Sequence, residues 1–160
     1  MKIQIFTTGG TIDKIYFDAK NTYKVGDPAV GEVLKEANVA VEYDVVSLLR
    51  KDSLELDDAD RRRIFDAVVA TPAQLIIITH GTDTMVLTAR SLKTIANKTI
   101  VLTGAMQPAK FRFTDAVFNI GAALTAVQVL PPGVYIAMNG RVFDADRVTK
   151  NVELNRFEES

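Results

Sequence analysis

Short runs of β-branched and apolar residues alternate along this chain with segments of helical periodicity. Ile, Val and Thr favour extended backbone, and several of the runs are apolar at every position, so we expect them to be strands. Strands that are apolar on both faces are typical of a parallel sheet covered by helices on both sides. The predicted strands are 3–8, 39–48, 75–79, 99–103 and 134–138.

Amphipathic segments occupy the intervals between the predicted strands. The segment 57–69 begins with Asp57, Asp58 and Asp60, which suit the positive end of a helix dipole, and continues with apolar residues at helical spacing. Alternation of strand and helix predicts a doubly wound α/β domain of the flavodoxin type, with a mainly parallel sheet in a three-layer arrangement. The predicted helices are 28–36, 57–69, 82–95 and 115–129, and we expect a long loop over 9–26.

The length and charge of the chain restrict its organisation and partners. The chain has 160 residues, 48% of them hydrophobic, so we expect one domain over 1–160 without a C-terminal domain. Lys and Arg number 19 against 20 Asp and Glu, which argues against nucleic acid or an anionic membrane as a partner. No export signal or membrane span is visible, so we expect a cytoplasmic protein, with a loosely held polar tail after Lys150.

The residue inventory restricts the catalytic chemistry. With 0 Cys and 1 His, the sequence excludes thiol nucleophiles, disulfides and multi-histidine metal sites, and we expect no metal and no cofactor. His80 is expected to be a hydrogen-bonded core residue rather than a general base, because nothing in the sequence assures it a partner carboxylate. Catalysis would therefore use oxygen and amine groups.

Polar motifs follow two of the predicted strands, at the sheet edge where such folds bind ligands. The segment 7–12 reads TTGGTI, whose glycines allow a sharp turn but do not match a Rossmann loop or a P-loop. The segment 79–84 reads THGTDT and opens a predicted helix. Taken alone, Thr82 and Asp83 are ordinary helix N-cap residues. Asp83 could also hold a ligand ammonium.

Together these motifs resemble the bacterial-type L-asparaginase and glutaminase-asparaginase family, amidohydrolases with a threonine nucleophile. The resemblance rests on TGGTI at 8–12 and HGTDT at 80–84, which occur in order at the ends of predicted strands. It implies the N-terminal catalytic domain of that family and its fold. Further similar segments are NTYKVG at 21–26, Asp52-Ser53, TGAMQP at 103–108 and RVTK at 147–150.

The resemblance implies that Thr11 is the nucleophile, with Tyr23 close to it on the loop, and that Ser53 binds the substrate carboxylate. A threonine hydroxyl is a poor nucleophile near neutral pH, so a base must lie nearby. Taken singly, Tyr23 would be a loop aromatic that covers apolar surface, and Ser53 a turn or cap residue. Leu54 stands where the family usually carries a polar side chain, so the pocket is expected to differ there.

The resemblance implies a second cluster of Thr82, Asp83 and Lys150. Lys150 would remove a proton through Thr82, while Asp83 would orient the lysine and bind the substrate's ammonium. A lysine acts as a base only where burial or nearby positive charge lowers its pKa, and by default Lys150 would be a solvated surface residue. Backbone N–H groups at 10–12, or at the start of the helix after Gly81, would stabilise the oxyanion.

These observations predict an amidohydrolase that converts the side-chain amide of asparagine, or of a related small amide, to acid and ammonia through an acyl-enzyme. Because the family's second domain has no counterpart here, we expect a homo-oligomer that covers the open face. The alternative is a non-catalytic module that binds an amino acid or dicarboxylate. A nucleotide or flavin binder is disfavoured by the missing phosphate motifs. Asp115 and Asn119 also match the family, as packing or capping residues.

Overall fold

A central sheet organises the computed structural model, which describes residues 1–16 and 22–160. Its strands are β1 Lys2–Gly9, β4 Glu42–Lys51, β5 Leu75–Thr79, β6 Thr99–Thr103, β7 Gly133–Met138 and β8 Arg141–Asp144. They form a 6-stranded sheet in the order β4-β1-β5-β6-β7-β8. Neighbouring strands from β4 to β7 are parallel, and β8 is antiparallel to β7. This order confirms the predicted doubly wound fold of the flavodoxin type.

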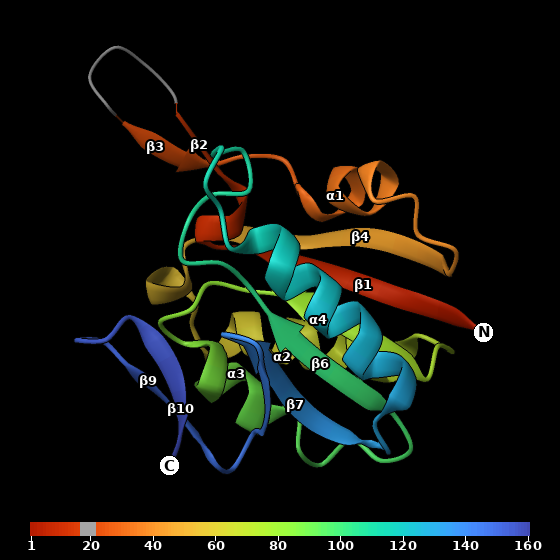
Figure 1. Cartoon of the computed structure of the whole chain (residues 1–160). Helices are drawn as coiled ribbons and strands as arrows, with labels where there is room; N and C mark the ends of the chain where they lie inside the picture. The colour runs from red at the N-terminus through yellow and green to blue at the C-terminus, as the bar shows by residue number, and fades with distance from the viewer. Residues whose placement is uncertain (17–21) are drawn as a thin grey trace.

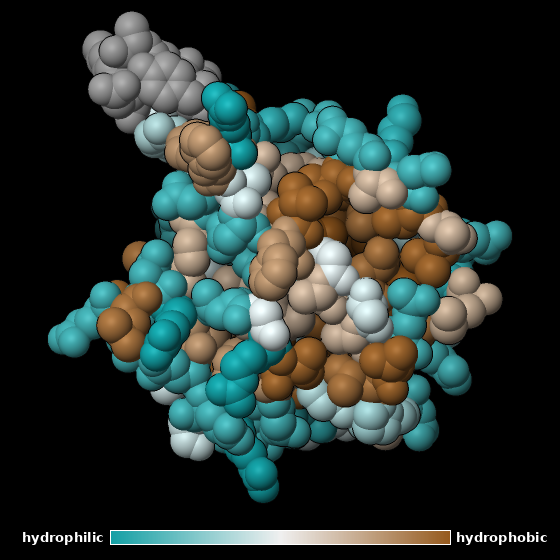
Figure 2. Space-filling model, in the orientation of Figure 1, coloured by the Kyte–Doolittle hydropathy of each residue, from teal (hydrophilic) through white to brown (hydrophobic). Residues whose placement is uncertain are grey.

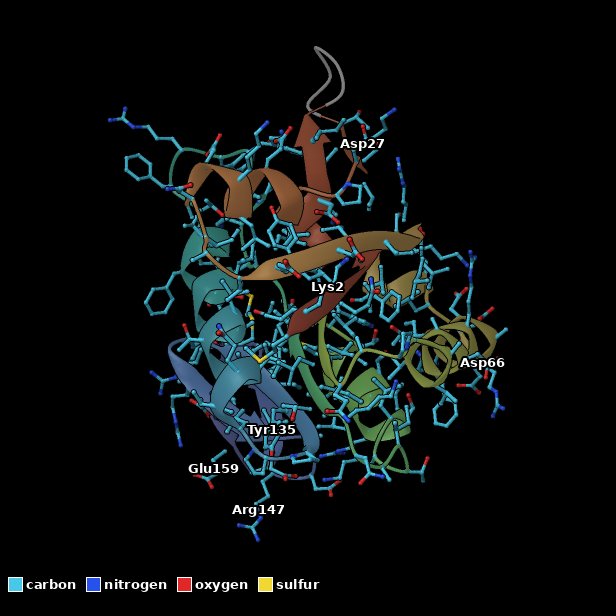
Figure 3. The ribbon with its side chains drawn as sticks, turned by 90° about the vertical axis from the view of Figure 1, so that its right-hand side faces the viewer. Lys2, Asp27, Asp66, Tyr135, Arg147 and Glu159 are labelled. Carbon is cyan, nitrogen blue, oxygen red and sulfur yellow. The ribbon has the colours of Figure 1, made fainter. Side chains whose placement is uncertain are left out.

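Helices cover both faces of the sheet, as Figures 1 and 3 show. α1 (Val30–Glu36) and α4 (Ala116–Val129) pack on one face, and α2 (Asp58–Ala70) and α3 (Met85–Ser91) pack on the other. Successive strand side chains point to opposite faces, so each face has its own apolar core. Within the described residues, no helix is both long and apolar enough to cross a bilayer. The expected cytoplasmic location stays a prediction.

The helix after β5 is shorter than the predicted 82–95, because contacts with other segments hold its first residues outside the helix. Thr84 Oγ1 donates a hydrogen bond to the Ser53 carbonyl at 2.8 Å. Thr82 Oγ1 accepts one from Lys150 Nζ at 2.8 Å. The α-helix therefore begins at Met85 rather than at Thr82.

Two hairpins lie outside the predicted elements. β2 (Lys14–Tyr16) pairs with β3 (Tyr23–Val25), so the described part of 9–26, expected to be a long loop, contains two short strands. Asn21 of the NTYKVG segment lies outside the described residues. β9 (Val148–Asn151) pairs with β10 (Arg156–Glu159), and Phe157 of β10 belongs to the core on the α3 side. The expectation of a loosely held tail after Lys150 is therefore wrong.

Replacing Phe157 with Ala tests whether the β9–β10 hairpin is part of the core. Phe157 is 2% exposed. Loss of a buried aromatic ring leaves a cavity, so we expect the free energy of unfolding to fall by about 3 kcal/mol, measured by chemical denaturation. Leu154→Ala is the control, because Leu154 is 57% exposed; it should change stability by less than about 0.5 kcal/mol. Equal stabilities of the two variants would show that the hairpin is only loosely attached.

Candidate functional site

The loops that follow β1, β4 and β5 meet at the carboxyl edge of the sheet. A methyl group built on Gly10 would lie 2.4 Å from the backbone nitrogen of Gly81, and one built on Gly81 would lie 2.5 Å from Cβ of Ser53. Neither glycine has room for a side chain. Gly10 also has a φ of 85°, which residues with a Cβ rarely adopt. Glycine at these two positions therefore brings the segments of Thr11, Ser53 and Thr82 together.

Lys150 reaches this edge from β9 and contacts both polar side chains that follow Gly81. Its Nζ donates hydrogen bonds to Thr82 Oγ1 and to Asp83 Oδ1, each at 2.8 Å. The Lys150 side chain is 15% exposed, so its interpretation as a solvated surface residue is wrong. The N-cap of α3 is Thr84, so Thr82 and Asp83 are not its N-cap residues. The three side chains are in contact, while their catalytic roles stay predictions.

Thr11 begins a short 3₁₀ turn, η1 (Thr11–Asp13), directly after the Gly10 contact. The backbone N–H of Lys14 donates to the Thr11 carbonyl and closes this turn. Thr11 is half-buried, and among residues 1–16 and 22–160 its hydroxyl makes no hydrogen bond. The described residues thus leave the hydroxyl available to a ligand at the sheet edge, and none of them places a base in contact with it.

Tyr23 lies at the outer end of the β2–β3 hairpin, which projects from the sheet edge (Figure 1). The register pairs Tyr23 with Tyr16, and its ring packs against Phe111 with the ring centroids 5.9 Å apart. Tyr23 is 45% exposed. The place of Tyr23 beside Thr11 stays a prediction.

Ser53 begins a second 3₁₀ turn, η2 (Ser53–Glu55), for which Asp52 is the N-cap. The Asp52 carboxylate accepts a hydrogen bond from the Leu54 N–H at 3.2 Å. Ser53 is buried against Gly81, and Leu54 is 73% exposed. Ser53 is thus a turn residue that lies at the site, with an apolar side chain beside it on the rim.

His80 follows β5, is fully buried and makes two hydrogen bonds. The Gly81 carbonyl can only accept, so Nδ1 donates to it at 2.7 Å, and Nε2 accepts from Thr88 Oγ1 at 2.8 Å. Burial lowers the pKa of His80 to about 4. The imidazole is therefore neutral at pH 7, and the expectation of a hydrogen-bonded core histidine is confirmed.

Asp115 and Asn119 hold the loop after β6. The Asp115 carboxylate accepts hydrogen bonds from the Met106 N–H at 2.9 Å and from the Gln107 N–H at 3.0 Å. Asn119 Nδ2 donates to the Gly104 carbonyl at 2.9 Å. Both residues therefore act on the loop backbone, in agreement with the packing or capping role expected for them.

Two residues that the motifs do not single out lie at the base of the β2–β3 hairpin. Asp13 is buried; its side chain accepts a hydrogen bond from the Ala29 N–H at 2.9 Å, and its carbonyl accepts one from the Gly26 N–H at 2.8 Å. Burial raises the pKa of the Asp13 carboxyl to about 6. Lys14 forms an ion pair with Asp52, with 2.9 Å between Nζ and Oδ2. Their only sequence signal is that they directly follow the TGGTI motif.

The edge as a whole offers hydroxyl, amine and carboxylate groups. In the part of the chain that the structure describes, no group of three or more His, Asp and Glu side chains could hold a metal ion. A groove beside Lys150 is lined in part by Asp83 and Val152. A larger hollow of about 720 Å³ lies at the amino edge of the sheet, around Lys2 and Gln74, and contains none of the predicted site residues.

Known proteins with similar sequences and structures share this arrangement of elements. A family model described as "Asparaginase, N-terminal" matches residues 2–158. The chain is 29% identical to a glutaminase-asparaginase from Acinetobacter glutaminasificans, over 96% of the chain and 50% of that protein. It is 30% identical to a glutamyl-tRNA(Gln) amidotransferase component from Methanococcus vannielii, over 89% of the chain and 35% of that protein.

A solved structure of an asparaginase has the same fold as this chain. The thermostable L-asparaginase from Thermococcus kodakarensis superimposes with a TM-score of 0.85 at 28% identity, over 99% of this chain and 51% of that chain. The sequence of an L-asparaginase from the same organism is 31% identical, over 99% of this chain and 51% of that protein. The chain thus spans about half the length of these asparaginase relatives.

Titration of His80 tests the buried hydrogen-bonded ring, and its signals need no assignment because the chain has 1 His. We expect the ring protons of the folded protein to titrate at about pH 4, below the ordinary 6.5, in proton NMR spectra. The urea-unfolded chain, as control, should titrate at about pH 6.5. As pH falls, the unfolded state binds the proton first, so stability present above pH 6.5 is lost toward pH 4. A folded-state midpoint equal to the unfolded one would contradict this account.

Proposed function

The chain belongs to the asparaginase family, in which it matches the N-terminal domain, and on this premise we propose that it hydrolyses the side-chain amide of asparagine, or of a related small amide, to acid and ammonia. The contact of Lys150 with Thr82 and Asp83 carries the proposal. A hydroxyl held by an amine is a catalytic arrangement that needs neither Cys nor His. The named relatives include a glutaminase-asparaginase and an L-asparaginase, so the proposed substrates include both amides.

Thr11 is the nucleophile of the proposed reaction. Its Oγ1 forms a bond to the amide carbonyl carbon as its proton is removed, and the backbone N–H groups of residues 11 and 12 stabilise the oxyanion, because the Gly10 N–H already donates to the Lys51 carbonyl at 2.9 Å. Collapse of this intermediate breaks the C–N bond, and the nitrogen takes up a proton and leaves as ammonia. Water then attacks the acyl-threonine ester, which releases the acid and restores the Thr11 hydroxyl.

Thr82, Asp83 and Lys150 supply proton transfer and orientation in this proposal. In its uncharged form, Lys150 Nζ accepts the proton of the Thr82 hydroxyl, 2.8 Å away, and the Thr82 oxygen in turn takes up the proton that Thr11 loses. The Asp83 side chain is 43% exposed, so its carboxylate can bind a substrate ammonium while it holds Lys150. Ser53 packs against Gly81 and, in this proposal, binds the substrate carboxylate.

Ammonia release measured with L-asparagine and with L-glutamine tests the proposed reaction. We expect Thr11→Ala to lower kcat by at least about 10³-fold because it removes the nucleophile, and Lys150→Met to lower it by about 10²-fold because it removes the base. Lys110→Met is the matched control, since Lys110 pairs with Glu32 on α1 and its side chain is 54% exposed. Equal rates for the wild type and Thr11→Ala, with any substrate, would eliminate Thr11 as the nucleophile.

The same purified proteins distinguish the enzyme from a binding module. A ligand that binds only the folded state raises the melting temperature. A rise with L-aspartate or L-asparagine, without ammonia release, would favour the non-catalytic module that binds an amino acid or dicarboxylate.

We also propose that the chain forms a homo-oligomer through the outer face of α4. The 14 residues of α4 include no charged side chain, and Val117, Phe118 and Val129 are all more than half exposed. Apolar side chains gather on the side of the molecule that α4 occupies (Figure 2). Contiguous apolar surface in water favours association, and a second copy presents the same surface.

Sedimentation equilibrium tests this association. We expect the wild type to sediment as a dimer or larger oligomer, and Phe118→Lys to shift it toward the monomer because a charge would be buried at the contact. Leu87→Lys is the control, since Leu87 is 53% exposed on α3, at the opposite face of the sheet. A monomeric wild type at micromolar concentration would contradict the proposal.

A further inference from the structure

One ion pair joins the turn that holds Thr11 to the turn that holds Ser53. Lys14 Nζ of β2 lies 2.9 Å from Asp52 Oδ2, directly before η2. We propose that Lys14 and Asp52 are positioning residues, whose ion pair holds the nucleophile turn and the carboxylate-binding turn at the separation that the substrate requires. This inference rests on the proposed function, because that function places Thr11 and Ser53 on the same substrate.

Each partner of the pair is bonded to the backbone of its own turn. The Lys14 N–H donates to the Thr11 carbonyl. The Asp52 carboxylate accepts from the Leu54 N–H at 3.2 Å, and the Asp52 carbonyl accepts from the Glu55 N–H at 2.9 Å. A change in the separation of the two charges would therefore displace the turns themselves, and not only two side chains.

The Lys14–Asp52 pair is less exposed to water than the nearby Arg50–Asp27 pair. The side chains of Lys14 and Asp52 are 27% and 33% exposed, against 52% and 88% for Arg50 and Asp27. Ion pairs that are fully exposed to solvent hold their partners weakly, and partial burial strengthens the attraction. The hydrogen bond from Lys14 holds the pKa of the Asp52 carboxyl below its ordinary value, so the carboxylate is charged at neutral pH.

Attachment of the hairpin does not depend on this pair. Asp13 already accepts hydrogen bonds from the backbone N–H groups of Gly26 and Ala29, and these close the base of the hairpin. The Ser53 turn is likewise held on its other side, where Thr84 Oγ1 donates to the Ser53 carbonyl. The backbone already joins the two loops just before these turns, where the Gly10 N–H donates to the Lys51 carbonyl at 2.9 Å. What the Lys14–Asp52 pair adds is a side-chain link between the turns themselves, so its loss should change their spacing without unfolding either.

A double-mutant cycle on amide hydrolysis tests the link. We expect Lys14→Met and Asp52→Asn each to raise KM by about 5- to 10-fold while kcat falls by less than about 3-fold, because Ser53 is displaced from the substrate carboxylate. Asp52→Asn retains an oxygen that can accept the Leu54 N–H. The double variant should be no worse than either single variant. Lys14→Arg, which keeps the charge, should leave KM within about 2-fold of the wild type.

Lys2→Met is the matched control for Lys14→Met. Lys2 also begins its strand with an ion pair, to Asp44 at 2.8 Å, but it lies at the amino edge of the sheet (Figure 3). Its loss should leave both kcat and KM unchanged. A KM that is unchanged in Lys14→Met, or single effects that multiply in the double variant, would overturn the proposal.

Hydrogen exchange separates this inference from the proposed function, because it needs no turnover. The amides of residues 13–16 and 53–55 should exchange faster in Lys14→Met and in Asp52→Asn, and at the wild-type rate in Lys2→Met. If the wild type hydrolyses no amide, the proposed function fails, and exchange alone decides the link between the turns. Faster exchange in both segments would support the link, and unchanged exchange would overturn it.

Discussion

The backbones of two loops touch at Gly10 and Gly81, and the arrangement of the candidate site depends on this contact. Each glycine occupies a space that no Cβ could share, and Ser53 packs against Gly81 from the other side. The parallel sheet ends all three strands at one edge, but a parallel sheet alone leaves its loops free to diverge. The close approach of the glycines is what brings a threonine turn, a serine turn and the Thr82 segment together at that edge.

A second constraint comes from the far end of the chain. Lys150 can contact Thr82 and Asp83 only because β9 is fastened to the body of the protein by buried side chains. Phe157, the register partner of Lys150 on β10, lies in the core, and Arg90 of α3 donates a hydrogen bond to the Ala145 carbonyl just before β9. An amine with 15% exposure in contact with a buried hydroxyl is therefore a product of core packing as much as of polar chemistry. Burial in the same core keeps the His80 imidazole neutral, and both of its ring nitrogens are already hydrogen-bonded.

The local sequence pattern predicts an element well where the apolar residues of that element alone account for its burial. The strands 75–79 and 99–103 coincide with β5 and β6, and the helix 115–129 differs from α4 by a single residue at its start. The pattern fails where contacts distant in sequence override local preference. Thr82 and Asp83 have the composition of helix caps, but Lys150 and the Ser53 turn hold that segment in a different conformation. The sequence pattern does not predict the hairpin of β9 and β10, because its residues are mostly polar and Phe157 is a single buried aromatic residue among them.

By itself, the sequence determined the layers of this protein, the edge at which its polar motifs meet and the oxygen and amine groups that its candidate site offers. These follow from periodicities of a few residues and from the absence of Cys, which need no knowledge of distant contacts. Only the tertiary structure decided which side chains touch: Lys150 with Thr82 and Asp83, and Lys14 with Asp52. The physical reason is that such pairs join residues 38 to 68 positions apart, so their distance is set by strand pairing and core packing and leaves no local pattern in the chain.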